Sequence, residues 1–139
     1  MANYNIVSRT NYFRVTDEAR YQELISCLYT DSGDKVDHVS YTGEDGVTRH
    51  MFGAYGVISY AEMEEEREDN SITEFTEKLQ EILPDNEAFV LLEIGNEKLR
   101  DVTATAIICT RDKDQIIDFA ELLSNAVGTM LGSDYALDF

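Results

Sequence analysis

The stretch Ala-Phe-Val-Leu-Leu-Glu-Ile at residues 88–94 decides the fold, because it is a nearly continuous apolar run of strand length. Such a run indicates a strand that is buried on both faces at the centre of a sheet. After Gly95 and Asn96, residues 99–110 alternate between apolar side chains and mostly threonine. The two runs therefore predict a β-hairpin at the centre of the fold.

Alternating apolar residues predict three further strands before this hairpin. Residues 11–16 place Phe13 and Val15 on one face of a first strand. Residues 35–42 form a second strand, and a turn at 43–46 joins it to a third strand over 47–60. With the hairpin, these segments predict a sheet of about five strands.

Two helices are predicted from apolar residues spaced at i, i+3, i+4 and i+7. The first begins at Thr16 or Asp17, either of which can cap it. The second begins with a capping box formed by Ser71 and Glu74, and Pro84 ends it. Their apolar positions are Tyr21, Leu24, Ile25 and Leu28 in the first, and Ile72, Phe75, Leu79, Ile82 and Leu83 in the second.

A third helix is predicted over residues 113–131, with Gly132 as its C-cap. The order of elements is then β-α-β-β-α-β-β-α, without a linker between two parts of the chain. This order predicts a single α+β domain over residues 1–139, with a mostly antiparallel five-stranded sheet and three helices on one face. The apolar positions of the third helix are Ile116, Ile117, Ala120, Leu123, Val127 and Met130.

The composition combines a substantial core with a strong negative charge. The chain has 139 residues, 43% of them hydrophobic, a net charge of −17 and a pI near 4.2. This charge argues against direct binding to nucleic acid or to an anionic membrane, and it favours a basic protein as the partner. Cys27 and Cys109 have no ligand-like spacing, the N-terminus resembles no signal peptide and no run approaches ~20 apolar residues. We expect free thiols and a cytoplasmic protein.

Most of the negative charge lies in the middle of the chain. Residues 61–87 contain eleven carboxylates against two basic residues. The densest part is 62–69, where a helix would place about one charge per 2 Å, near the ~1.7 Å per phosphate charge of duplex DNA. An extended chain would give about one charge per 4 Å. Because the predicted capping box follows it, this acidic segment at about 61–70 should form a loop or a short separate turn.

No pattern in the sequence predicts catalysis, a cofactor or a metal site. His38 and His50 lack the spacing of a metal site, so a surface or packing role is expected for both. Glu93 interrupts the central strand and could be an acid or base with a raised pKa. Strand alternation favours the simpler expectation that it points to the open face of the sheet, toward Lys98 or Arg100 on the hairpin partner.

The expected partner-binding residues are the carboxylates of the acidic segment and their neighbours. Three glutamates of the second helix extend the negative field, and two tyrosines approach it along the chain and could add aromatic contacts. This set comprises Glu62, Glu64, Glu65, Glu66, Glu68, Asp69, Glu74, Glu77, Glu81, Tyr55 and Tyr60.

Three blocks of sequence carry a resemblance to known proteins. They are Asn-Tyr-Phe-Arg-Val-Thr-Asp-Glu at 11–18, Phe-Gly-Ala-Tyr-Gly-Val-Ile-Ser at 52–59 and Glu-Ile-Gly-Asn-Glu-Lys-Leu-Arg at 93–100. With the acidic middle, they resemble small acidic proteins of phages and mobile elements of Gram-positive bacteria. By charge and size, the chain is also similar to DNA-mimic anti-restriction and anti-CRISPR proteins, which occupy the nucleic-acid groove of a nuclease. That similarity implies a bacterial host and a target such as the Arg-rich motif-reading site of an RNA-guided nuclease.

Three functional hypotheses follow. The first is a non-enzymatic inhibitor of the anti-CRISPR or anti-restriction type, which binds the basic groove of a host defence nuclease as a DNA mimic. The second is a protein–protein interaction module of a mobile element, in which the acidic segment is only a solvated loop. The third is a small-molecule enzyme that would use Glu93 and His38.

Overall fold

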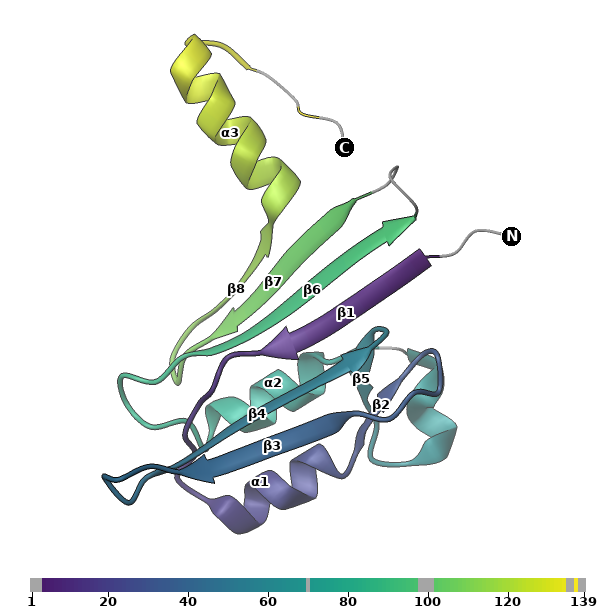
Figure 1. Cartoon of the computed structure of the whole chain (residues 1–139), viewed down its shortest axis with the longest axis vertical. Coiled ribbons are helices and arrows are strands. Elements are labelled where there is room, and N and C mark those ends of the chain that lie inside the picture. The colour runs from purple at the N-terminus through teal and green to yellow at the C-terminus, as the bar shows by residue number, and fades with distance from the viewer. Residues whose placement is uncertain (1–3, 70, 98–101, 135–136, 138–139) are drawn as a thin grey trace.

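The computed structural model describes residues 4–69, 71–97, 102–134 and 137, and only the backbone of Tyr4, Glu66, Glu68 and Asp69. Its main sheet is antiparallel and has the strand order β3-β4-β1-β6-β7-β8, and a small sheet pairs β2 with β5 (Figure 1). The strands are β1 (Tyr4–Thr10), β2 (Leu28–Thr30), β3 (Asp37–Thr42), β4 (Thr48–Tyr55), β5 (Ile58–Tyr60), β6 (Phe89–Glu97), β7 (Thr103–Cys109) and β8 (Asp114–Asp118).

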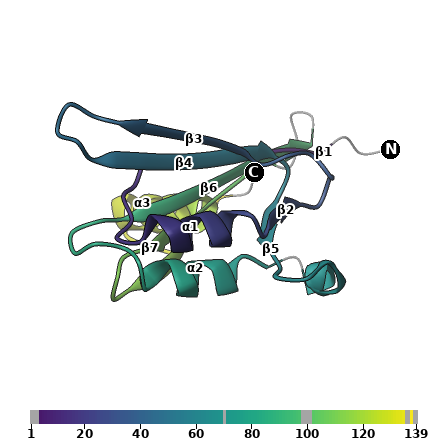
Figure 2. The same cartoon turned by 90° about the horizontal axis from the view of Figure 1, so that it is seen from below.

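The helices are α1 (Glu18–Ile25), α2 (Thr73–Gln80) and α3 (Phe119–Leu131), and a 3₁₀ helix, η1, spans Glu64–Asp69. Helices α1 and α2 lie side by side on one face of the sheet (Figure 2). Helix α3 continues from β8 and lies beyond that edge of the sheet, away from α1 and α2 (Figure 1). The predicted α+β class is confirmed. The main sheet has six strands where about five were predicted, and α3 does not join α1 and α2 on one face as predicted, because it extends beyond edge strand β8. Among the described residues, no helix is long and apolar enough to cross a membrane.

The predicted central hairpin is confirmed. β6 and β7 are antiparallel, with Leu92 opposite Ala106, and β1 pairs with the other side of β6 so that Val7 lies opposite Ile94. The predicted start of the second strand, Leu99, lies outside the described residues. β6 therefore occupies the middle of the sheet, as its apolar run indicates.

The first strand lies earlier in the chain than predicted. β1 covers residues 4–10, while 11–16 contribute only an isolated bridge between Phe13 and His50. The prediction was wrong because β1 buries hydroxyl side chains. Ser8 donates a hydrogen bond to the carbonyl of Gly56 at 2.7 Å, and Thr10 accepts one from the amide of Phe52 at 3.0 Å.

The third helix begins at residue 119 and not at 113, because residues 114–118 form β8. Ile116 and Ile117 are β-branched, which favours a strand, and they pair with Ile107 and Ala106 of β7. Asp118 then caps α3 through a hydrogen bond from the Ala120 amide. The predicted C-cap is confirmed, since Gly132 has a left-handed φ of 68°.

Three further boundaries differ from the sequence-based expectation. α1 ends at Ile25, and Leu28, which was predicted in its apolar face, begins β2. α2 begins at Thr73, and Ser71 accepts a hydrogen bond from the Thr73 amide, so the predicted Ser71–Glu74 capping box does not form. The third predicted strand is divided into β4 and β5 at Gly56, whose φ is 118°. A Cβ at Gly56 would also lie 2.8 Å from Ser32 Oγ, so only glycine fits this break.

Four phenylalanines form the centre of the core between the sheet and helices α1 and α2. Phe13, Phe52, Phe75 and Phe89 are fully buried. Their rings meet edge to face at 5.2 Å between Phe13 and Phe89 and 5.6 Å between Phe52 and Phe75. Aromatic pairs in this geometry stabilise the fold beyond the area they bury.

Replacing Phe52 by alanine should lower the free energy of unfolding by about 3–5 kcal/mol, because the cavity lies among three other rings. Urea denaturation followed by circular dichroism measures this change. Val39→Ala, at a half-exposed position of edge strand β3, is the control and should cost less than about 1 kcal/mol. Equal effects of the two substitutions would contradict the assigned core.

Candidate partner-binding surface

The acidic segment forms a short helix of its own. η1 follows β5 and precedes α2, as a separate turn of the kind predicted (Figure 1). Its two ends are attached to the body: the amide of Ala61 donates to the carbonyl of Cys27 at 3.1 Å, and the amide of Tyr60 donates to the carbonyl of Ser71 at 2.9 Å. The segment is therefore closed at its base by backbone hydrogen bonds.

Arg67, the one base within the acidic segment, holds η1 against the small sheet. The Tyr29 hydroxyl donates a hydrogen bond to the Arg67 carbonyl at 2.5 Å. The Arg67 guanidinium lies 5.0 Å from the centre of the Tyr29 ring, a cation–π contact, and 3.8 Å from a carboxylate oxygen of Glu64. This anchor was not foreseen from the sequence, because Tyr29 and Arg67 are far apart in the chain.

Lys78 of α2 compensates two of the predicted site carboxylates. Its ammonium group pairs with Glu62 and lies 3.1 Å from Glu74 Oε1. The hydrogen bond and the charge of Lys78 lower the pKa of Glu62, and the Tyr60 hydroxyl, which donates to the same carboxylate, adds to the effect. Glu62 and Glu74 therefore present less net charge to a partner than their neighbours do.

Other carboxylates of the predicted set remain available. Glu65, Glu77 and Glu81 are exposed and take part in no ion pair within the described part of the chain. The side chain of Glu64 is exposed beside Arg67. The side chains of Glu66, Glu68 and Asp69 lie outside the described residues, although their backbone belongs to η1.

The fold places the two tyrosines of the predicted set in different environments. Tyr60 is only 6% exposed and packs on Phe75, so its ring belongs to the core and is not a contact surface. Tyr55 is 71% exposed, but it lies opposite Val7 on the sheet face that carries no helix in the described structure. The break at Gly56 separates two rings that are close in sequence, and the contact role of Tyr55 stays a prediction.

This second face of the sheet, here called the open face, is largely apolar. Register places Val7, Tyr55 and Ile94 side by side on it, and Leu92 lies next to them. All four side chains are more than one-third exposed. Among the described strand residues, the charges of the open face are Arg9, Arg49 and a single carboxylate, Asp37. The open face thus differs sharply from the rest of a chain with a net charge of −17.

Glu93 does not point to the open face as predicted. It lies opposite Ser8 and Thr105, and Ser8 is buried on the face that packs against the helices. Partial burial, and next the negative charge of Asp31, raise the pKa of Glu93. Its expected partners, Lys98 and Arg100, lie outside the described residues.

His50 forms a hydrogen-bonded arrangement that superficially resembles a hydrolase triad. Its Nδ1 lies 2.6 Å from Ser40 Oγ and its Nε2 lies 2.7 Å from Glu18 Oε2. The imidazole is 2% exposed and stacks on Tyr21, with ring centres 4.4 Å apart. Both ring nitrogens are thus occupied inside the core, and none of the described hollows is lined by these residues. His50 therefore has the packing role expected of it.

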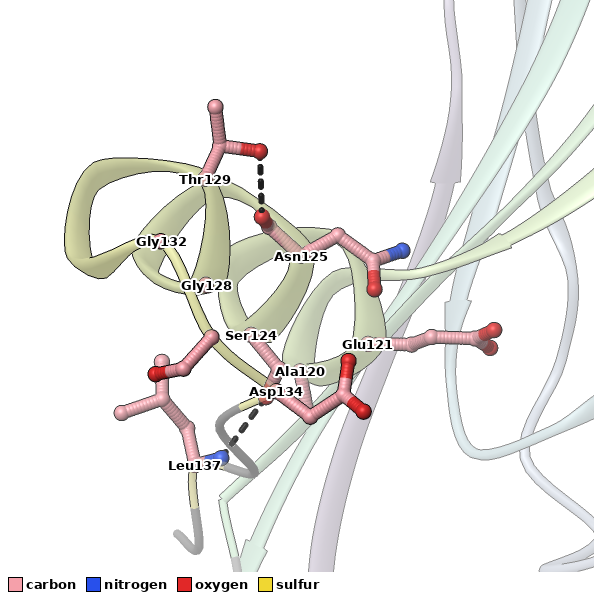
Figure 3. A pocket seen from close by; sticks show the side chains of 10 residues that line it. Ala120, Glu121, Ser124, Asn125, Gly128, Thr129, Gly132, Asp134 and Leu137 are labelled. Carbon is pink, nitrogen blue, oxygen red and sulfur yellow. Dashed lines mark hydrogen bonds between the residues drawn. The ribbon is translucent and has the colours of Figure 1, made fainter.

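The described residues contain no group of side chains suited to hold a metal ion. A hollow of about 1090 Å³ lies beside α3 (Figure 3). Small and polar side chains dominate its wall, and the two carboxylates on it make no ion pair among the described residues. Its lining residues are Ala120, Glu121, Ser124, Asn125, Gly128, Thr129, Gly132, Ser133, Asp134 and Leu137.

Comparisons of the chain with protein-family models, with curated proteins and with solved structures found no match. Two surfaces that the fold separates are the candidates for binding a partner. One is the acidic surface, comprising η1 and the exposed glutamates of α2, and the other is the open face of the sheet.

Replacing Lys78 by methionine should raise the pKa of Glu62 toward its ordinary range, as measured by NMR titration of the carboxyl carbon. Because the pKa of Glu62 is lowered in the folded state, the pair stabilises the fold at neutral pH. That contribution is lost as the pH falls through the lowered pKa. Lys113→Met, in the turn between β7 and β8, is the control. An unchanged pKa in Lys78→Met would contradict the pairing.

Proposed function

We propose that the protein is a non-enzymatic inhibitor whose acidic surface occupies the basic nucleic-acid groove of another protein. The observation that carries this proposal is the geometry of η1. At about 2.0 Å rise per residue, its six residues extend for about 12 Å and contain five carboxylates. This is about one carboxylate per 2.4 Å, or about one net negative charge per 3 Å when Arg67 is counted, between the ~1.7 Å of duplex DNA and the ~3.4 Å of one strand.

The attachment of η1 supports this function. Its base is closed by backbone hydrogen bonds, and Arg67 is held by Tyr29. A partner would therefore meet carboxylates on a positioned backbone and would not need to order a flexible loop. Such preorganisation reduces the entropy lost on binding.

The exposed glutamates of α2 extend the same field. Glu77 and Glu81 are exposed on the helix side of the molecule and are not neutralised by a neighbour in the described structure. A field of this kind accelerates association with a cationic groove and makes binding sensitive to salt.

The partner class comes from the resemblance to phage and mobile-element proteins. Together with the acidic surface, it favours a nuclease of bacterial host defence, bound at a site where Arg and Lys normally contact DNA. The inhibitor would compete with nucleic acid and would have no need for a cofactor or a catalytic group.

Capture from a bacterial lysate on the immobilised protein should retrieve a nucleic-acid enzyme that duplex DNA displaces. The triple variant Glu64→Gln, Glu65→Gln, Glu77→Gln should weaken this binding at least tenfold and flatten its salt dependence, as measured by calorimetry on the purified partner. The control, Glu44→Gln, Asp112→Asn, Asp114→Asn, removes the same charge from exposed positions elsewhere and should bind almost normally. Full binding by the first variant would contradict the proposal.

A second candidate function is supported by the open face. Its exposed apolar side chains, Val7, Tyr55, Leu92 and Ile94, suit a protein–protein interaction module in which η1 is only a solvated element. A partner retained at high salt, and equally by both triple variants, would favour this function over DNA mimicry.

A further inference from the structure

Helix α3 is an apolar helix without a buried side chain. Its thirteen residues include one charged residue, Glu121, and none of them is buried. Leu122, Leu123, Met130 and Leu131 are all largely exposed, and Met130 reaches 83%. A helix of this composition normally packs against another surface, because each exposed Å² of apolar area costs about 25 cal/mol.

The exposed side chains of α3 form a ridge. Leu122, Ala126 and Met130 follow one another at i, i+4 and i+8, and Leu123 lies beside them. The small residues Ser124 and Gly128 lie on the opposite side of the helix from this ridge, and they line the hollow of Figure 3. There the Leu137 amide donates a hydrogen bond to Ser124 Oγ at 2.7 Å. The chain following α3 therefore meets the small-residue side, and the ridge remains exposed.

The chemistry of the ridge restricts what can cover it. It has no basic residue to bind an anionic lipid surface, and the net charge of −17 repels such a surface. A strongly charged surface would gain nothing from contact with four apolar side chains. The surface that covers the ridge must therefore be apolar and carry little charge, whatever the net charge of the protein to which it belongs.

We propose that the ridge of α3 docks on the open face of a second copy of this chain. The open face presents Val7, Leu92, Ile94 and Tyr55, and Asp37 is the one carboxylate among its described strand residues. Asp31 and Asp34, from the loop after β2, line a hollow beside Val7 and Tyr55. Two copies related by a twofold axis would each place α3 on the sheet of the other, which closes the assembly. The contact would involve the ridge and the open face, and would leave free the acidic surface that the proposed inhibitor would use.

The distribution of charge on the molecule favours self-association through the ridge and the open face. Two chains with a net charge of −17 each repel one another wherever their carboxylates come close together. Contact through the ridge and the strand residues of the open face brings few carboxylates together. Glu121 is the single charge of α3, and Arg9 lies next to Leu92 on the open face, so these two charges are of opposite sign. Because the remaining carboxylates still repel at longer range, salt should strengthen this dimer.

The estimated area of the contact indicates a weak interface between the two copies. α3 is about 20 Å long and about 10 Å wide, so a reciprocal pair of helix-on-sheet contacts removes about 800 Å² of surface from water. Specific stable interfaces bury about 1,200 Å² or more. A contact of this size belongs to the weak, transient class, so we expect a reversible dimer that forms at micromolar to millimolar concentrations.

Sedimentation velocity of the full chain, from about 1 μM to 1 mM, tests the proposal over the expected range. The unaltered chain should pass from monomer to dimer, and Met130→Glu should weaken the dimer at least tenfold. Met63→Glu is the matched control, since it adds the same charge at a 61% exposed methionine beside the acidic surface. It should dimerise almost as the unaltered chain does. Both variants should keep the circular dichroism spectrum and melting temperature of the parent, because neither methionine is buried.

A mixture of two variants shows which surface the ridge contacts. Tyr55→Glu alters the open face at an exposed side chain and should also weaken the dimer. An equimolar mixture of Met130→Glu and Tyr55→Glu keeps one intact helix-on-sheet contact, so it should associate more strongly than either variant alone.

Three results would overturn the inference. They are a monomer at every concentration and salt, equal dimerisation of Met130→Glu and Met63→Glu, or a mixture no stronger than its components. Absence of the dimer would not contradict the proposed function, because the inhibitor would bind through the acidic surface. Salt distinguishes the two interactions: binding through the acidic surface should weaken with salt, whereas the dimer should become stronger.

Discussion

The central constraint on this molecule is that its sheet is covered by helices on one face only. β6 pairs with β1 and β7 along its length, and its alternate side chains Phe89 and Leu91 face the core beneath α1 and α2. Leu92 and Ile94 of the same strand point to the open face and remain exposed. A strand that is apolar on both faces needs a packing layer on each face. In the part of the chain that the structure describes, α1 and α2 provide this layer on one face only.

This one-sided covering separates charge from apolar surface. The carboxylates of η1 and α2 lie on the helix side, where Lys78 and Arg67 compensate some of them and leave others free. The open face has Asp37 as its one carboxylate among the described strand residues. The molecule can therefore meet a cationic partner with one side and an apolar, neutral partner with the other, and the two interactions respond to salt in opposite directions.

Polar groups in the core join segments that the hydrophobic pattern does not connect. His50 bridges Ser40 of β3 and Glu18 of α1, and its backbone pairs with Phe13. Ser8 and Thr10 complete the hydrogen bonding of Gly56 and Phe52. Buried polar groups with satisfied partners favour one arrangement of the chain, since an arrangement that separates them from these partners costs their hydrogen bonds. The resemblance of His50 to a catalytic residue is a consequence of this structural role.

Periodicity and composition alone determined the α+β class, the β6–β7 hairpin, the apolar faces of α1 and α2, the Gly132 cap and a separate acidic element, because each depends on neighbours within a few residues. Only the tertiary structure decided that Ser8 and Thr10 belong to the first strand, since their hydrogen-bond partners lie more than forty positions away. It also decided the burial of Tyr60, the direction of Glu93 and the exposure of α3. The physical reason is that a local pattern specifies which residues share a face, whereas long-range packing decides what covers that face.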